Sequence, residues 1–230
     1  MKNKKGRFIT IEGGEGVGKT LFLSRFIPKL EALGISVLST REPGGTPVAE
    51  SLRKLFSNPP PGEPLMIETE LFVISAARAQ HVSQKIKPAL SKGTWVICDR
   101  FVDSTRVYQG KLGGFPSKLL EHILQTSTYF IEPDLTLLLD CDVSLALSRV
   151  RNRSKQPATN SKNSPECPTT SEDGASRYDS ANLSFHENLR QAYLELVRRF
   201  PSRIVKIDTS DAIDDVVDSS LAIVRRKFNV

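Results

Sequence analysis

A glycine-rich stretch near the amino terminus has the pattern of a phosphate-binding loop. It satisfies G-x-x-x-x-G-K-[ST] and reads Gly13-Gly14-Glu15-Gly16-Val17-Gly18-Lys19-Thr20. The loop follows the apolar run FITIE and leads into a helical pattern, which is the context that this motif requires. Its glycines let consecutive backbone N–H groups turn toward a phosphate, and the helix N-terminus adds partial positive charge. The segment therefore predicts a nucleoside triphosphate site, in which Lys19 reaches the β- and γ-phosphates and Thr20 ligates Mg²⁺.

Two classes of protein use such a site: phosphotransferases, and nucleotide-dependent switches or ATPases that act on a partner. A GTPase switch would carry D-x-x-G and N-K-x-D, and the sequence contains neither. A second polar pair, Asp99-Arg100, follows an apolar run. Asp99 is suited to holding Mg²⁺ or polarising an acceptor, and Arg100 to clamping a second phosphate. Taken alone, the pair also fits a simple ion pair at a strand end.

The elements that must position these residues alternate along the chain as short apolar runs and helical patterns. Apolar runs without polar alternation are typical of strands buried on both faces of a parallel sheet. Strands are expected at Phe8–Glu12, Ile35–Thr40, Trp95–Asp99, Leu135–Asp140 and Ile204–Ile207. Helices are expected at Thr20–Leu33, Pro47–Leu55, Glu68–Leu90, Ser117–Thr126, Val143–Arg153, Leu183–Arg199 and Ala212–Phe228. This order predicts a three-layer α/β/α fold around a five-stranded parallel sheet, with ligands at the carboxyl ends of its strands.

Composition narrows the range of partners. The chain has 230 residues, a net charge of +6 and 39% hydrophobic residues, which suits one domain with a packed core. The net positive charge favours anionic partners, but apart from Lys2–Lys5 the basic residues are dispersed, which is more typical of a solvated surface than of a nucleic-acid footprint. Cys98, Cys141 and Cys167 show no C-x-x-C spacing, and no apolar run has the length of a signal peptide core or a membrane span. A cytoplasmic protein without membrane contact is expected.

One segment departs from the strand–helix rhythm. Ser154–Ser176 contains no aliphatic residue larger than alanine and is rich in Ser, Thr, Asn and Pro. Such a stretch buries too little apolar area to offset the entropy of ordering it. We interpret it as a mobile insert in a lid spanning about residues 149–177, within a single domain of residues 1–230.

Several blocks, in one order, resemble bacterial thymidylate kinases along nearly the whole chain. They are IEGGEGVGKT, TREPGGT, AARAQ, IKPAL with GTWVICDR, DSTRVYQG and PDLTLLLD. The resemblance implies a P-loop kinase fold, ATP as donor, dTMP as acceptor, Mg²⁺, and a homodimer. The implied reaction gives ADP and dTDP, for dTTP synthesis. Another nucleoside monophosphate kinase is the nearest alternative, and a partner-binding P-loop ATPase is a more distant one.

The resemblance also assigns the groups around the acceptor's phosphate and sugar. Glu15 is similar to a family carboxylate that approaches the sugar 3′-hydroxyl. Arg53 and Arg100 are similar to the pair that holds the acceptor phosphate, although an arginine in a helical run, such as Arg53, more often faces solvent. The loop TREPGGT, at residues 40–46, is implied to place its charged pair, Arg41 and Glu42, near the phosphates.

Other positions match the family's base pocket. Arg78 resembles the residue that hydrogen-bonds a thymine carbonyl, and Ser104 and Thr105 are implied to lie near the base edge. Tyr108 is implied to lie beside the deoxyribose, where an aromatic wall disfavours a 2′-hydroxyl; a core aromatic is the alternative. Gln109 resembles a further acceptor-pocket residue.

The sequence departs from the family pattern at three places. Ile74 stands where many relatives have Phe stacking on thymine, so the aromatic contribution to base binding is missing. Ser176-Arg177 replaces Asp-Arg at the end of the lid, and the Ser154–Ser176 insert is longer than the family lid.

The P-loop carries no basic residue between Glu15 and Val17, so another arginine is expected to meet the charge of the transferring phosphoryl group. Arg149, Arg151 and Arg153 match the basic run that begins the lid in relatives of this type. Arg149 and Arg153 share a helix face. Arg153 is the first candidate, with Arg149 and Arg177 in reserve, and a solvated basic helix end is the alternative.

Overall fold

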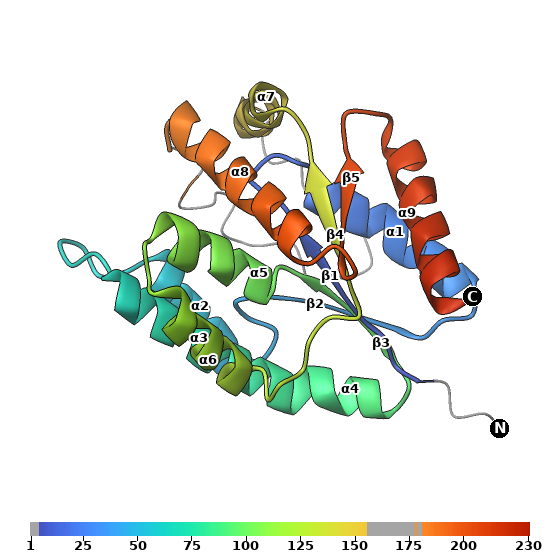
Figure 1. The fold of residues 1–230 in the computed structure, drawn as a ribbon, viewed down its shortest axis with the longest axis horizontal. Coiled ribbons are helices and arrows are strands. Elements are labelled where there is room, and N and C mark those ends of the chain that lie inside the picture. The colour runs from blue at the N-terminus through green and yellow to red at the C-terminus, as the bar shows by residue number, and fades with distance from the viewer. Residues whose placement is uncertain (1–4, 156–177, 179–180) are drawn as a thin grey trace.

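The fold is a parallel β-sheet between two layers of helices (Figure 1). The computed structural model describes residues 5–155, 178 and 181–230. Its five strands are ordered β2-β3-β1-β4-β5, and every neighbouring pair is parallel. The strands are β1 (Phe8–Glu12), β2 (Val37–Arg41), β3 (Trp95–Asp99), β4 (Leu135–Asp140) and β5 (Ile204–Asp208). The expected five-stranded α/β/α architecture is confirmed.

Strand burial follows position in the sheet. The central strands β1 and β4 are buried throughout, and β3 is buried up to its last residue. The edge strands β2 and β5 are only partly buried. The expectation that strands are buried on both faces is therefore confirmed for the central strands and wrong for the two edge strands. In addition, β2 starts two residues later than predicted.

Helices cover both faces of the sheet. They are α1 (Lys19–Ala32), α2 (Pro47–Ser57), α3 (Ile67–His81), α4 (Lys87–Ser91), α5 (Val102–Thr105), α6 (Ser117–Ser127), α7 (Val143–Lys155), α8 (Leu183–Arg199) and α9 (Ile213–Phe228). Two π-helical segments are η1 (Val82–Ile86) and η2 (Arg106–Leu112). The single helix predicted over Glu68–Leu90 is thus a succession of α3, η1 and α4. The α5–η2 segment was not predicted.

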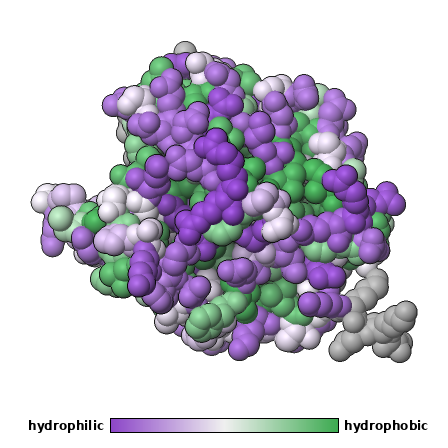
Figure 2. Space-filling view, viewed as in Figure 1, coloured by the Kyte–Doolittle hydropathy of each residue, from purple (hydrophilic) through white to green (hydrophobic). Residues whose placement is uncertain are grey.

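Alternate side chains of β1 build the two halves of the core. Ile9 and Ile11 pack with α1 and α9, which lie side by side in Figure 1. Phe8 packs on the other face with residues of α3, η1 and α6. A third cluster joins β4 and β5 to α8 and η2. With these apolar side chains turned inward, the face shown in Figure 2 is mainly hydrophilic.

Several sequence expectations fall on the remaining part of the chain. The Ser154–Ser176 insert, Arg177 and Cys167 lie wholly or almost wholly outside the described residues, as does the side chain of Arg153. Within the described part, Cys98 and Cys141 are buried free thiols. No helix of that part is long and apolar enough to cross a membrane.

Candidate active site

The glycine-rich loop joins the end of β1 to the start of α1 at the carboxyl edge of the sheet. Gly18 caps α1 with φ 93°, and Gly16 has φ 76°. A side chain at Gly16 would also collide with α7, because its Cβ would lie 2.1 Å from the Ala146 carbonyl oxygen. Only glycine therefore permits both the turn and the close approach of α7.

Lys19 folds back over this loop. Its Nζ donates hydrogen bonds to the carbonyl oxygens of Gly13 (2.9 Å) and Gly14 (2.8 Å). Burial, together with the positive charge of Arg100, lowers the Lys19 pKa to about 8. A bound polyphosphate would supply the negative charge that stabilises the protonated amine.

A polar cluster lies beside the loop and joins it to the segment after β3. Arg100 Nη2 donates to Glu15 Oε1 at 3.1 Å, and the Tyr108 hydroxyl donates to the same oxygen at 2.8 Å. Burial raises the pKa of Glu15, but the charges of Arg100 and Lys19 outweigh it, so its pKa lies below the ordinary value. Arg100 has φ 63°, a left-handed conformation that is costly for a residue with a side chain. The cluster therefore holds a carboxylate and a strained arginine next to the P-loop.

A second cluster surrounds Arg78 on α3. Its Nε donates to Glu42 Oε2 at 2.7 Å, and its Nη2 donates to Thr105 Oγ1 at 2.8 Å. Glu42 Oε1 also lies 3.0 Å from His81 Nδ1. Arg78 Nη1 is buried without a hydrogen-bond partner in the described part of the chain. One donor of this guanidinium is therefore available to a ligand.

The remaining acceptor-pocket candidates come from α2, α3 and the α5–η2 segment. Arg53 Nη1 donates to the Pro43 carbonyl oxygen at 2.9 Å. Ser104 Oγ accepts from Arg100 Nη1 at 3.3 Å, and Gln109 Nε2 donates to Glu70 Oε2 at 3.1 Å. Ile74, on α3 one turn before Arg78, is buried.

The two residues predicted to hold Mg²⁺, Asp99 and Thr20, have the oxygen ligands that a hard cation prefers. Asp99 ends β3, and its Oδ1 is buried with no hydrogen-bond partner among the described residues. Thr20 lies in the first turn of α1 and is exposed. A carboxylate oxygen and a hydroxyl beside a phosphate site are suitable Mg²⁺ ligands, directly or through water.

Comparison of the chain with known proteins shows which family it belongs to. A sequence model of the thymidylate kinase family matches residues 11–220. The chain belongs to the thymidylate kinase family. It is 38% identical to a thymidylate kinase of Magnetococcus marinus over 98% of this chain and 99% of that protein. It is 39% identical to one of Chromohalobacter salexigens over 94% and 93% of the two chains. A crystal structure of thymidylate kinase from Ehrlichia chaffeensis matches with a TM-score of 0.70 at 25% identity, covering 96% and 99% of the chains.

The arginines predicted to begin a lid are only partly described. Arg149 Nη2 donates to the Thr209 carbonyl oxygen at 2.9 Å, so this guanidinium is attached to the end of β5. Arg151 is exposed. Arg153 belongs to the last turns of α7, and its assignment stays a prediction.

Three polar residues of this thymidylate kinase site were not predicted: Glu12, His186 and Tyr193. His186 and Tyr193 lie on α8 and line a pocket between the P-loop, β4 and α7. His186 Nδ1 is 3.9 Å from Glu15 Oε2, and its Nε2 has no hydrogen-bond partner in the described part. No motif marks His186 and Tyr193, because they reach the site from a helix far along the sequence. Glu12, in contrast, ends the run FITIE directly before the P-loop.

The charged pair of the TREPGGT loop is divided between two partners. Glu42 belongs to the Arg78 cluster, whereas Arg41 Nη2 donates to Glu50 Oε2 at 3.2 Å. Glu50 Oε1 in turn accepts from the Gly45 N–H at 2.8 Å. Glu42 thus supports the candidate base pocket through Arg78.

Proposed function

We propose that this protein transfers the γ-phosphoryl group of ATP to the 5′-phosphate of dTMP, giving ADP and dTDP. The observation that carries the proposal is the Arg100–Glu15–Tyr108 cluster directly beside the P-loop, which supplies a second cationic position facing the first. Two neighbouring phosphate sites are what a nucleoside monophosphate kinase requires, since its reaction joins two phosphates. Family membership supports thymidylate as the acceptor.

The roles follow from the charges available. Backbone N–H groups of the loop at residues 13–20 and the Lys19 amine hold the donor phosphates, and Thr20 and Asp99 hold Mg²⁺. Mg²⁺, when bound, neutralises charge on the β- and γ-phosphates. Arg100, with Arg53 from α2, takes the acceptor phosphate.

The acceptor's sugar and base are assigned to the two clusters. Glu15 and Tyr108 face the deoxyribose, where the buried aromatic ring leaves little room for a 2′-hydroxyl. Arg78 presents its uncommitted Nη1 to a thymine carbonyl, with Thr105, Ser104 and Gln109 around the base and Ile74 covering its face. A buried donor held in place favours binding of a base that accepts its hydrogen bond, and it weakens binding of a base that leaves it unpaired.

Charge on the transferring phosphoryl group needs a further cation, because the P-loop has none besides Lys19. We assign this role to Arg153, with Arg149 as the alternative. Catalysis then rests on positioning and charge neutralisation, since phosphoryl transfer requires little covalent chemistry from the protein.

A coupled assay of ADP formation tests the function. The purified protein is given ATP·Mg²⁺ with dTMP, dUMP, UMP, dCMP, AMP or GMP, and ADP is measured for each acceptor. We expect rapid ADP formation with dTMP, less with dUMP, and little with the ribonucleotides. Preference for another acceptor would replace dTMP in this assignment. Slow, acceptor-independent hydrolysis would instead indicate a P-loop ATPase, and Lys19→Ala serves as the inactive control.

We further propose that two copies associate, in the cytoplasm, through the outer face of α2, α3 and α6. The helix α3 packs against both neighbours, and these three helices with their flanking residues carry exposed hydrophobic side chains. They are Val48, Leu55, Met66, Phe72, Leu119, Tyr129 and Phe130. An apolar face of this kind is typical of a protein interface.

Sedimentation or light scattering tests this association. Phe72, 59% exposed on α3, is changed to Glu, with Leu21→Glu as the control because Leu21 is similarly exposed (51%) on α1. We expect Phe72→Glu to yield monomer and Leu21→Glu to leave the dimer intact. A wild-type monomer at micromolar concentration would contradict the proposal.

A further inference from the structure

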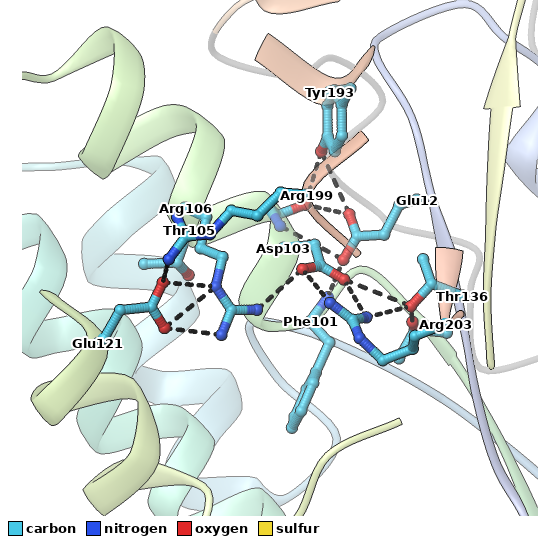
Figure 3. A network of polar contacts seen from close by, with 12 residues as sticks. Glu12, Phe101, Asp103, Thr105, Arg106, Glu121, Thr136, Tyr193, Arg199 and Arg203 are labelled. Carbon is cyan, nitrogen blue, oxygen red and sulfur yellow. Dashed lines mark hydrogen bonds and ion pairs between the residues drawn. The ribbon is translucent and has the colours of Figure 1, made fainter. Parts of the chain in front are cut away.

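Glu12 is a fully buried carboxylate at the end of β1, immediately before the P-loop. Its Oε1 accepts hydrogen bonds from the backbone N–H groups of Phe101 (2.7 Å) and Ser104 (3.3 Å). Its Oε2 accepts from the Ser104 hydroxyl (2.6 Å) and the Tyr193 hydroxyl (3.2 Å). Figure 3 shows it between Phe101 and Tyr193. One side chain therefore ties β1 to the first turn of α5 and to α8.

The same two hydroxyl groups also hold Arg100. Arg100 Nη1 donates to Ser104 Oγ at 3.3 Å and to Tyr193 Oη at 3.2 Å. These two oxygens are themselves only 2.9 Å apart. Because Arg100 has a left-handed backbone, its orientation depends on such surrounding contacts. Glu12 is thus linked to the guanidinium through two shared hydroxyl groups.

The charge state of Glu12 is balanced between opposing groups. Burial and the negative charge of Asp103 raise its pKa, while the Ser104 hydrogen bond and the charge of Arg100 lower it, and the result is about 7. The carboxyl group also interacts electrostatically with three other titratable groups: Lys19 on α1, Tyr193 on α8 and Cys98 on β3. A change of charge beside Arg100 is therefore expected to change the protonation of Glu12.

We propose that Glu12 is a positioning residue of the acceptor-phosphate site: it aims Arg100 through Ser104 and Tyr193, and it takes up a proton when an anionic phosphate binds beside Arg100. The proposal rests on the assignment of Arg100 to the acceptor phosphate. A phosphate dianion bound beside Arg100 offsets the positive charge that stabilises ionised Glu12. In a buried site, water screens this electrostatic effect poorly, so the pKa of Glu12 should rise.

The proton balance leaves the framework intact. One proton passes from the buffer to Glu12 Oε2, which then donates to the oxygen of Ser104 or Tyr193 in place of accepting from it. Each of these oxygens has further lone pairs, so both still accept from Arg100. The guanidinium consequently stays aimed while the net charge of the site adjusts to the ligand.

Isothermal titration calorimetry with dTMP, in two buffers of different ionisation enthalpy, measures the protons taken up on binding. At pH 7.5 we expect wild type to take up more than Glu12→Gln, by at most about 0.8 proton, the share of Glu12 that a pKa of about 7 leaves ionised. Other titrating groups, including Lys19, Glu15 and the ligand phosphate, are present in both proteins. Thymidine, which lacks the phosphate, should show no such difference.

Kinetics provide the positioning readout. Glu12→Gln places an amide donor toward two hydroxyls, so we expect the KM for dTMP to rise roughly tenfold, the effect of one charged hydrogen bond, while the KM for ATP stays unchanged. Glu121→Gln is the matched control. Glu121 belongs to the same polar network and accepts hydrogen bonds from Arg106 and Arg199 (Figure 3). Among the described residues, no hydrogen bond or ion pair joins it to Glu12 or Arg100.

Equal proton uptake and equal KM values for wild type and Glu12→Gln would overturn the proposal, as would an equal loss of uptake in Glu121→Gln. If Glu12→Gln does not fold, the pH dependence of proton uptake in Tyr193→Phe tests the proposal instead. This substitution removes one donor to ionised Glu12, so the pH of greatest uptake should move upward, and an unmoved pH dependence overturns the proposal. Failure of wild type to phosphorylate dTMP would refute the proposed function instead.

Discussion

The pair formed by Arg78 and Glu42 allows stability and ligand binding to be separated by mutation. The two side chains are 1% and 2% exposed, and Arg78 Nε lies 2.7 Å from Glu42 Oε2. Arg78→Ala would leave a buried carboxylate whose remaining ion-pair partner, among the described residues, is His81 at 3.0 Å. Loss of one member of a buried ion pair costs about 3–5 kcal/mol, which in a domain of this size lowers the melting temperature by roughly 6–20 °C.

The assay combines thermal unfolding with dTMP titration. Adding Glu42→Gln to Arg78→Ala removes the uncompensated charge, so the double variant should regain much of the stability and still bind dTMP poorly. Arg41→Ala is the control, because its partner Glu50 is 36% exposed and such pairs contribute at most about 1 kcal/mol. An Arg78→Ala protein that melts like wild type would refute the reasoning. So would a double variant that regains dTMP affinity together with stability.

Substitutions at three other residues test the site. Lys19→Ala should lower kcat by about 10²–10³-fold in a folded protein. Since the Lys19 pKa is about 8, wild-type ATP binding should weaken as pH rises through that value, whereas Lys19→Arg should show a flat profile up to pH 9. Ile74→Phe should leave dTMP affinity unchanged or up to about tenfold tighter, because an aromatic stack contributes about 0.5–1.5 kcal/mol; a large loss in calorimetry would mean that Ile74 belongs to the core. Arg153→Ala should reduce kcat far more than it raises the KM for dTMP, and an unchanged kcat would move the role to Arg149 or Arg177.

Local patterns were sufficient for the P-loop and most elements of the fold. Gly16 and Gly18 adopt positive φ values in a turn that their neighbours in sequence define. The strands at Phe8–Glu12, Trp95–Asp99 and Leu135–Asp140 have the predicted bounds, because continuous apolar runs are buried in the middle of a parallel sheet. Many candidate site residues came from resemblance to a family, and their roles remain predictions.

Tertiary structure alone decided the α5–η2 segment and the groups behind it. The first N–H groups of this helical segment have no capping side chain nearby in sequence. Instead Glu12, at the end of β1, accepts from the N–H groups of Phe101 and Ser104. Arg203, before β5, pairs with Asp103 in the same segment (Figure 3). A sequence pattern registers neighbours a few residues apart, whereas these contacts join residues about 90 to 100 positions apart. They form only in the folded sheet, whose strand order places β3 beside β1, and β4 between β1 and β5.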